Sequence, residues 1–202
     1  MKTLLLGTRN EGKIEEAKEL LVGISGMELL TFADCPFPDV EETGATFLEN
    51  ALLKARSISK QTGLCVLSED AGLEVQALGG RPGVRSARFA GEPSNAHRNN
   101  RQLLTELEGI TNRRARFVAV AALRLTDDQQ FLTTGVFEGA IGHELRGTQG
   151  FGYDPLFIPD GETRTLAEMA VAEKNLISHR FRALSRMVRL IEHLFESGEW
   201  PS

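Results

Sequence analysis

Short apolar segments alternate with amphipathic helical patterns through the first third of this 202-residue chain. Residues 2–7 predict a buried strand, and residues 11–22 predict a helix with Asn10 as its N-cap. Residues 27–32 predict a second strand, and residues 47–62 predict a second helix. Such alternation is typical of a sheet covered by helices, so the sequence predicts an α/β fold.

The second predicted helix follows a loop of residues 33–46 that contains two prolines and a glycine. Thr46 and Glu49 have the spacing of a capping box, which fixes where the helix begins. Its predicted apolar face consists of Phe47, Ala51, Leu52, Ala55 and Ile58.

A third strand is predicted over residues 64–68, and it ends in an acidic turn, SEDAG, residues 68–72. Most of residues 72–91 read as a glycine-rich loop, and residues 95–107 read as a helix. Residues 115–125 are mostly apolar on both of their alternating faces, which predicts a strand covered on both sides.

A turn at Asp127 and Asp128 leads to residues 130–141, which we expect to form a hairpin partner for the preceding strand. This hairpin makes the predicted sheet mixed. Residues 146–157 form another glycine-rich loop. The C-terminal helix has the clearest stripe: Ile177, Phe181, Leu184, Val188, Ile191 and Phe195.

Composition limits the classes of partner and the compartment. A net charge of −5 and a pI near 5.5 argue against binding nucleic acid or an anionic membrane non-specifically. The N-terminal MKTLLLG is too short for a signal sequence, and no window approaches the ~18 apolar residues of a membrane span. Cys35 and Cys65 form no CxxC motif, which indicates reduced thiols. We therefore expect a soluble cytoplasmic protein.

Four polar clusters fall in predicted loops at strand ends, where α/β sheets usually hold ligands. The first is TRNEGK, residues 8–13, where Lys13 can pair with a phosphate and Thr8 and Asn10 can donate hydrogen bonds. The spacing is not that of a Walker loop. The cluster alone fits an anion site and an ordinary helix cap equally well.

The second and third clusters are VEETG, residues 40–44, and SEDAG. Each places adjacent carboxylates in a predicted turn. Mg²⁺ binds oxygen ligands, usually one or two carboxylates together with substrate phosphates and waters. The alternative for each is a solvated surface turn, since acidic residues are mostly exposed.

The fourth cluster pairs GTQGFGYDP, residues 147–155, with KNLISHR, residues 174–180. Phe151 and Tyr153 offer flat rings for stacking on a base, with Lys174, His179 and Arg180 as nearby donors. The alternative is a hydrophobic anchor in a loop and a helix N-terminus capped by Ser178. No nucleophile motif accompanies these clusters. The inventory therefore favours metal-dependent attack of water on a nucleoside polyphosphate.

Five segments in this order resemble the inosine/xanthosine triphosphate pyrophosphatases (ITPases), from about residue 4 to residue 190. They are TRNEGK, EETGATFLENALLKA, SEDAGLEVQALGGRPGVRSARFAG, GFGYDPLF and EKNLISHR. The resemblance implies one elongated domain over residues 1–202, with two lobes around a central mixed sheet and the active-site cleft between them. It also implies a homodimer that uses Mg²⁺ to hydrolyse ITP, dITP and XTP to the monophosphate and pyrophosphate, with no nucleic-acid or membrane partner.

The resemblance also implies roles for individual residues. Asp70 matches the catalytic proton acceptor and a metal ligand, and Glu42 matches the second metal carboxylate, with Glu69 as a further candidate. Many members have two aspartates and a serine where this chain has Glu69, Asp70 and Ala71, so Ala71 can offer substrate only its backbone. Residues matching substrate-binding positions are Thr8, Arg9, Asn10, Glu11, Gly12, Lys13, Phe151, Gly152, Tyr153, Asp154, Lys174, His179 and Arg180. Arg9 stands at a variable position of the first motif.

Two other functions remain open at this point. One is a pyrophosphatase for other nucleotides, such as pyrimidine triphosphates, on a similar sheet. The other is a non-catalytic nucleotide-binding or RNA-binding module, against which the acidic net charge and Asp70 both count.

Overall fold

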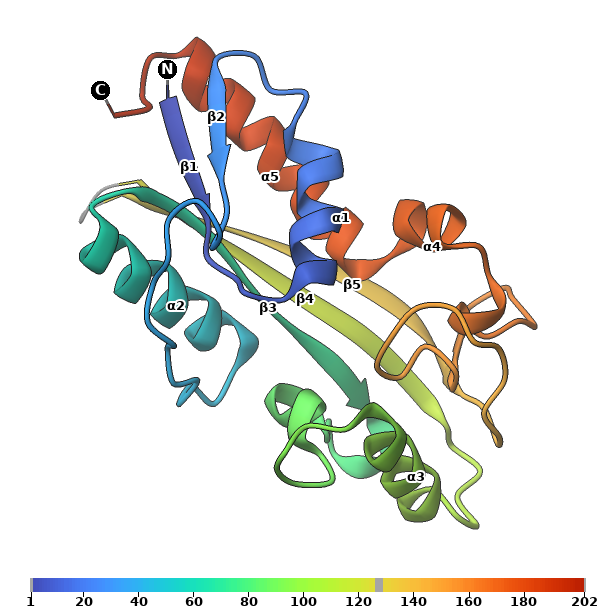
Figure 1. The fold of residues 1–202 in the computed structure, drawn as a ribbon. Coiled ribbons are helices and arrows are strands. Elements are labelled where there is room, and N and C mark those ends of the chain that lie inside the picture. Colours follow the sequence, from blue (N-terminus) through green and yellow to red (C-terminus); the bar gives the residue numbers. More distant parts are fainter. Residues whose placement is uncertain (1, 126–128, 202) are drawn as a thin grey trace. The chain divides into compact units, whose positions relative to one another are not determined.

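The computed structural model describes residues 2–125 and 129–201, and it confirms an α/β fold with a mixed sheet flanked by helices (Figure 1). The strands are β1 (Lys2–Leu6), β2 (Met27–Leu30), β3 (Cys65–Val75), β4 (Arg114–Arg124), β5 (Gln130–Ile141) and β6 (Phe157–Pro159). The helices are α1 (Glu11–Leu21), α2 (Phe47–Thr62), α3 (Ala96–Glu106), α4 (Val171–Ile177) and α5 (His179–Glu196). The turn predicted at Asp127 and Asp128 lies outside the described residues.

The six strands are hydrogen-bonded in the order β2-β1-β3-β4-β5-β6. β1 pairs in parallel with β2 and with β3, whereas β5 and β6 are antiparallel. The sheet is therefore mixed, as predicted. β1 lies between two parallel neighbours, which explains why its sequence is a continuous apolar run.

The chain divides into two compact units. Unit 1 consists of Met1–Asp70, Ala119–Gly135 and Arg180–Ser202, and unit 2 consists of Ala71–Val118 and Val136–His179. Strands β3, β4 and β5 each contribute residues to both units. Each unit has an apolar core of its own, and the single two-lobed domain stays a prediction.

In unit 1, helices cover both faces of β1. Leu5 packs with Phe37, Ile58 of α2 and Val66 of β3. Leu4 and Leu6 are also buried and, because side chains alternate along a strand, they face the other way. α1 and α5 lie side by side in Figure 1.

The start of α2 confirms the predicted capping box. The Thr46 side chain accepts a hydrogen bond from the Glu49 backbone N–H at 3.1 Å, and the Glu49 carboxylate accepts one from the Thr46 N–H at 3.2 Å. Both contacts satisfy backbone groups that a helix start leaves without intrahelical partners.

Unit 2 has its own apolar core, built around β3, β4 and β5 where they pass through this unit. Its buried members are Leu73, Val75, Leu103, Leu107, Ala115, Phe117, Phe137, Ile141, Tyr153, Leu156, Phe157, Leu166 and Met169. None of the helices among the described residues combines the length and the apolar character that crossing a bilayer requires.

Two sequence predictions about local structure are wrong. The segment SEDAG is not a turn, because β3 continues through it to Val75. The C-terminal stripe is right at Leu184 and Ile191 and wrong elsewhere: a break at Ser178 separates α4 from α5, and the rest of the buried face is Arg180, Ala183, Met187 and Leu194. In both places buried charged groups find partners far away in sequence, which a local pattern does not reveal.

Candidate active site

The TRNEGK loop, residues 8–13, joins β1 to α1 and forms the predicted helix cap. The Asn10 side-chain oxygen accepts a hydrogen bond from the Lys13 N–H at 3.0 Å, and the Thr8 hydroxyl oxygen accepts one from the Asn10 N–H at 3.2 Å. Glu11 and Gly12 form the first turn of the helix. The N-cap prediction is confirmed, and the cap leaves the positive end of α1 available to an anion.

Lys13 extends from this first turn into a largely buried position. Its ammonium lies 3.8 Å from the Glu69 carboxylate, and its side chain is 19% exposed. Burial lowers the pKa of Lys13, and the nearby Glu69 offsets that effect only in part. The Lys13 charge is thus incompletely compensated, and an anionic group beside it would stabilise the charged form.

Alternation along β3 sends its two consecutive carboxylates to opposite faces of the sheet. Val66 packs against α2, the Ser68 hydroxyl donates to the Ala51 carbonyl of α2 at 2.6 Å, and Asp70 also contacts α2. Glu69, between Ser68 and Asp70, instead contacts Arg180 of α5 and Lys13 of α1. The pleat therefore gives two adjacent acidic residues separate sets of partners.

Asp70 and Glu42 share one cation. The Lys54 ammonium donates to Glu42 Oε1 at 2.5 Å and to Asp70 Oδ1 at 3.2 Å. Burial raises the pKa of Asp70, with Lys54 acting in the opposite sense and Glu42 adding to the increase. Burial alone would lower the pKa of Lys54, but Asp70 and Glu42 together raise it. The cluster thus holds a charged ammonium between two carboxylates.

Asn50 connects this pair to the segment that carries Glu42. Its amide nitrogen donates to Asp70 Oδ2 at 3.1 Å, and its oxygen accepts from the Gly44 N–H at 2.7 Å. A Cβ at position 44 would lie 2.6 Å from the Asn50 oxygen, so only glycine permits this approach. Asn50 is 1% exposed, and its two contacts fix the EETG segment against Asp70.

Arg180 is bound by carboxylates on the other face of β3. Its Nε donates to Glu69 at 2.6 Å and its Nη1 donates to Glu16 at 2.5 Å. Burial opposes the charge of Arg180, but the two carboxylates outweigh it and raise the pKa of the guanidinium. Arg180 therefore stays charged, and its fork joins β3, α1 and α5.

These residues satisfy the basic requirements for a divalent cation. Within residues 2–125 and 129–201, no group of three or more His, Cys, Asp or Glu side chains is arranged to hold a metal ion. Two carboxylates are enough for Mg²⁺, because substrate phosphates and waters complete its shell. Asp70 and Glu42 already hold a cation, the Lys54 ammonium, so the pair fits a cation chemically. The charged cluster pairs three cations with four carboxylates. The cations are Lys13, Lys54 and Arg180, and the carboxylates are Glu16, Glu42, Glu69 and Asp70.

Arg9 points away from this cluster, toward the loop that follows β2. Its guanidinium carbon lies 4.8 Å from the Phe32 ring centroid and 5.8 Å from that of Phe37. Nη2 donates to the Phe37 carbonyl at 2.5 Å, and Nη1 lies 3.6 Å from the Asp39 carboxylate.

In unit 2 the FGYD loop, residues 151–154, is built around Asp154. Its Oδ2 accepts from the Phe151 N–H at 2.9 Å and from the Lys174 ammonium at 3.0 Å. A Cβ at position 150 would lie 2.1 Å from the same oxygen, and Gly150 has a φ of +75°. The Asn100 amide donates to the Gly152 carbonyl at 2.8 Å. The loop is therefore fixed at several points before any ligand binds.

The two aromatic rings of this loop have different environments. Tyr153 is buried in the core, and its hydroxyl donates to the Ser86 carbonyl at 2.8 Å. Tyr153 is therefore a hydrophobic anchor of the loop, the alternative to stacking on a base. Phe151 is 49% exposed, with the Lys174 ammonium 4.7 Å from its ring centroid. Phe151 is thus the ring with a face open to a ligand.

The remaining predicted residues fall in separate places. His179 stacks on Phe117 in unit 2, with ring centroids 4.8 Å apart and planes 11° apart. Ala71 is half-buried in β3, directly after Asp70. The three donors predicted to act together belong to different units: Lys174 and His179 to unit 2 and Arg180 to unit 1.

Sequence reasoning assigned no role to Asn50, Lys54 or Asn100. A signal for the first two is present, because Asn50 and Lys54 fall on the same helical period as Ala51, Ala55 and Ile58 of the buried face. Polar residues at apolar positions of a helix need partners, and here both bind Asp70. Asn100 gives no comparable signal.

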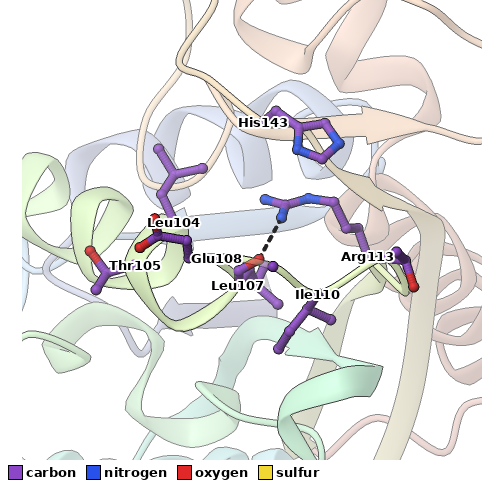
Figure 2. Close-up of a pocket in the computed structure, with 9 residues that line it drawn as sticks. Leu104, Thr105, Leu107, Glu108, Ile110, Arg113 and His143 are labelled. Carbon is purple, nitrogen blue, oxygen red and sulfur yellow. Dashed lines mark hydrogen bonds between the residues drawn. The ribbon is translucent and has the colours of Figure 1, made fainter.

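A hollow of about 680 Å³ in unit 2 lies at the end of α3 (Figure 2). Arg113, Ile110 and His143 are among its lining residues. The Arg113 guanidinium donates to the carbonyls of Leu107, Ile141 and Gly142, so it ties the end of α3 to the end of β5. No residue predicted to bind substrate lines this hollow.

The sequence and the structure both match known proteins over nearly their whole lengths. A family model for the Ham1 family matches residues 4–190. The chain is 48% identical to a dITP/XTP pyrophosphatase of Elusimicrobium minutum, over 94% of this chain and 99% of that protein. It is 42% identical to one of Bacillus subtilis, over 95% of this chain and 98% of that protein.

Solved structures agree. A HAM1 protein from Coxiella burnetii superimposes with a TM-score of 0.90 at 40% identity, covering 96% of this chain and all of that one. A nucleoside-triphosphatase, dITP/XTP pyrophosphatase, from Mycobacterium abscessus gives a TM-score of 0.78 at 41% identity, covering 92% of this chain and 98% of that one. The chain belongs to the Ham1 family.

Proposed function

We propose that this chain hydrolyses the non-canonical purine nucleotides dITP, XTP and ITP to the nucleoside monophosphate and pyrophosphate. The observation that carries the proposal is the buried Asp70, paired with Glu42 through one Lys54 ammonium, in a chain whose relatives are dITP/XTP pyrophosphatases. A buried carboxylate with a raised pKa is a suitable proton acceptor.

Each part of the charged cluster has a role in this proposal. Lys13 and the N-terminus of α1 bind the triphosphate, since both are positive and the Lys13 charge is incompletely compensated. Asp70 accepts a proton from the water that attacks the α-phosphorus, and the bond to the β-phosphate oxygen breaks to release pyrophosphate. If Mg²⁺ bound Glu42 and Asp70, the Lys54 ammonium that now pairs with them could pair with the phosphates instead.

Glu42 and Asp70 would hold Mg²⁺. When bound, the ion would neutralise the charge of the triphosphate oxygens. Glu69 is a weaker candidate as a ligand, because its carboxylate is bonded to Arg180 and lies near Lys13 on the opposite face of β3.

Selectivity for the base can be argued from hydrogen-bond donors and acceptors. Hypoxanthine and xanthine present an O6 acceptor and an N1–H donor, whereas adenine presents the reverse at both positions. We assign the O6 donor to His179, because the Nε and Nη1 of Arg180 already donate to carboxylates. Asp154 or a backbone carbonyl accepts from N1–H, and Phe151 stacks on the base. Adenine would leave these groups unpaired, which can discriminate by about 10⁴-fold or more.

Three further properties belong to the proposal because the resemblance implies them: Mg²⁺ as cofactor, a homodimer, and action in the cytoplasm. Light scattering of the purified protein tests the dimer, which requires twice the mass of the 22.2 kDa chain.

The decisive test is a hydrolysis panel with dITP, XTP, ITP, GTP, ATP and dTTP, with and without Mg²⁺, in which pyrophosphate is resolved from orthophosphate. Turnover of the first three with pyrophosphate as first product supports the proposal. Turnover of dTTP instead would indicate a pyrophosphatase for pyrimidine nucleotides. Nucleotide binding without turnover would indicate a non-catalytic module.

A further inference from the structure

We propose that Arg9 is a positioning residue that ties the TRNEGK loop to the segment between β2 and α2, residues 31–46, which carries Glu42. The inference rests on the proposed function for its effect on turnover. Its structural part stands on the contacts of Arg9 alone.

Among the residues that the structure describes, the Arg9 side chain contacts Phe32, Phe37 and Asp39, all of which belong to this segment. Its guanidinium lies over both Phe32 and Phe37, whose rings meet edge to face with centroids 5.2 Å apart. Nη2 donates to the Phe37 carbonyl and Nη1 approaches Asp39. A planar guanidinium can stack and donate at the same time, which an ammonium does less well.

A contact from Arg9 matters because residues 31–46 are firmly held at some positions and exposed at others. Phe37 is buried in the core beside Leu5, Ile58 and Val66. Its other end is held through Gly44 and Asn50. Between these two anchors Asp39 and Glu41 are exposed, and Glu42 is half-buried. The position of Glu42 is therefore set by these two anchors and by the Lys54 ammonium that binds its carboxylate, and Arg9 fixes the first anchor to the loop that carries Lys13.

The geometry argues against Arg9 as a ligand of the triphosphate. The stacking contacts and the Phe37 carbonyl occupy the guanidinium on the side of the β2–α2 segment. The side chain is 39% exposed, so its charge adds little to the attraction of an anion through water. Its effect on catalysis passes through the placement of Glu42.

The test compares Arg9→Met and Arg9→Lys with the unmodified protein, and uses a native reporter. Cys35 is a half-buried free thiol packed beside the same aromatic pair, and Cys65 is a half-buried free thiol on β3. Alkylation of each thiol by iodoacetamide, resolved by mass spectrometry without substrate or metal, reports opening of the segment. Lys2→Met is the matched control, because Lys2 lies over the Phe195 ring at 4.6 Å elsewhere in unit 1.

We expect Arg9→Met to speed alkylation of Cys35 by about tenfold and to leave Cys65 unchanged, because a cation–π contact and a charged hydrogen bond are both lost. Arg9→Lys should fall between Arg9→Met and the unmodified protein. The value of kcat/KM for dITP should fall about tenfold in Arg9→Met, mainly through kcat, as expected for a misplaced catalytic group. Lys2→Met should change neither readout.

An unchanged Cys35 rate in Arg9→Met would overturn the proposal. So would a rise in KM with kcat and the Cys35 rate unchanged, since that result would make Arg9 a substrate ligand. If the unmodified protein turns over no nucleotide at all, the proposed function fails but the alkylation rates still decide whether Arg9 holds the segment.

Discussion

Substitution of Asn50 by Asp tests the central contact of the candidate site. The change keeps the oxygen that accepts from the Gly44 N–H, but it replaces the amide that donates to Asp70 with a second carboxylate. Two carboxylates would then lie about as close as the 3.1 Å that now separates the Asn50 amide nitrogen from Asp70 Oδ2. Like charges at this distance cannot both ionise freely.

The size of the effect follows from Coulomb's law. At an effective dielectric constant of about 20, two unit charges this close repel by about 5 kcal/mol. The Lys54 ammonium, 3.2 Å from Asp70, offsets part of this repulsion. A net effect of about 2–3 kcal/mol raises the higher apparent pKa of the pair by about 2, because each pKa unit corresponds to about 1.4 kcal/mol.

The assay is the pH dependence of kcat for dITP between pH 5 and pH 9 at saturating Mg²⁺. The acid limb of the Asn50→Asp profile should lie about 2 pH units above that of the unmodified protein, which lowers activity at a given pH on that limb by up to about 100-fold, and activity should recover as the pH rises and the proton leaves. Asn50→Leu is the matched control, because it removes the same donor without adding a charge. Its loss should depend on pH less steeply, because removing the Asn50 donor raises the pKa of Asp70 without adding a second negative charge.

Stability gives an independent check with a fixed sign. Between the carboxyl pKa of the unfolded chain, near 4, and the raised pKa of the pair, the native state binds more protons than the unfolded state. The free energy of unfolding of Asn50→Asp must therefore fall as the pH rises through that window. Asp70 in the unmodified protein also has a raised pKa, so the free energy of unfolding of that protein should fall with rising pH in the same way, but less steeply. Parallel pH profiles for Asn50→Asp and the unmodified protein would refute the reasoning.

Three other perturbations follow from the same structure. Asp70→Asn should lower kcat by about 10²–10⁴-fold while dITP binding stays measurable by calorimetry, and near-normal turnover would remove Asp70 from its role as proton acceptor. Thr46→Ala should lower the free energy of unfolding by about 1 kcal/mol and Tm by about 2–4 °C in a thermal melt, because it removes the capping box with Glu49, and Thr46→Ser should retain most of that stability. Chelation by EDTA should abolish turnover but shift Tm by less than about 2 °C, because Lys54 neutralises Asp70 and Glu42 without a metal; unfolding on chelation would contradict this.

The elements that sequence predicted well carry their signals locally. The helix α2 has a capping box at its start, an apolar period along its length and Gly63 in the left-handed conformation at its end. The strand β1 is an apolar run that ends at Gly7. In these elements propensity, capping and periodicity agree, and the structure confirms their bounds to within one residue.

The predictions failed where burial of charge depends on distant partners. SEDAG has the composition of a turn, yet Glu69 is 7% exposed because Arg180, 111 residues away, binds its carboxylate. A local pattern cannot show that a carboxylate will be paired, so it favours exposure. For the same reason, the local pattern did not predict the hydrogen bond between Arg9 and Phe37, which are 28 residues apart.

In the candidate site too, the motifs could be identified from the sequence, whereas the contacts between their residues could not. Asp70 and Glu42 could be picked from sequence because the motifs that carry them match those of a known family. Their connection could not, because it runs through Lys54 and Asn50, two polar residues on the buried face of α2. A helix prediction that assigns every polar residue to solvent does not identify Lys54 and Asn50 as partners of Asp70.

The two adjacent carboxylates of β3, Glu69 and Asp70, also differ in how easily each can exchange its cationic partner for another cation. Glu69 is bonded to a buried guanidinium that also binds Glu16, so releasing it would leave a buried Arg180 with half of its compensation. Asp70 is paired with an ammonium on a flexible side chain, which can move to another anion when a divalent cation replaces it. Because the ammonium partner of Asp70 can be displaced more easily than the guanidinium partner of Glu69, the side of β3 that faces α2 is the side on which the proposed Mg²⁺ would bind. The Glu69 side chain, one methylene longer than aspartate, then matters chiefly for how firmly Arg180 is held.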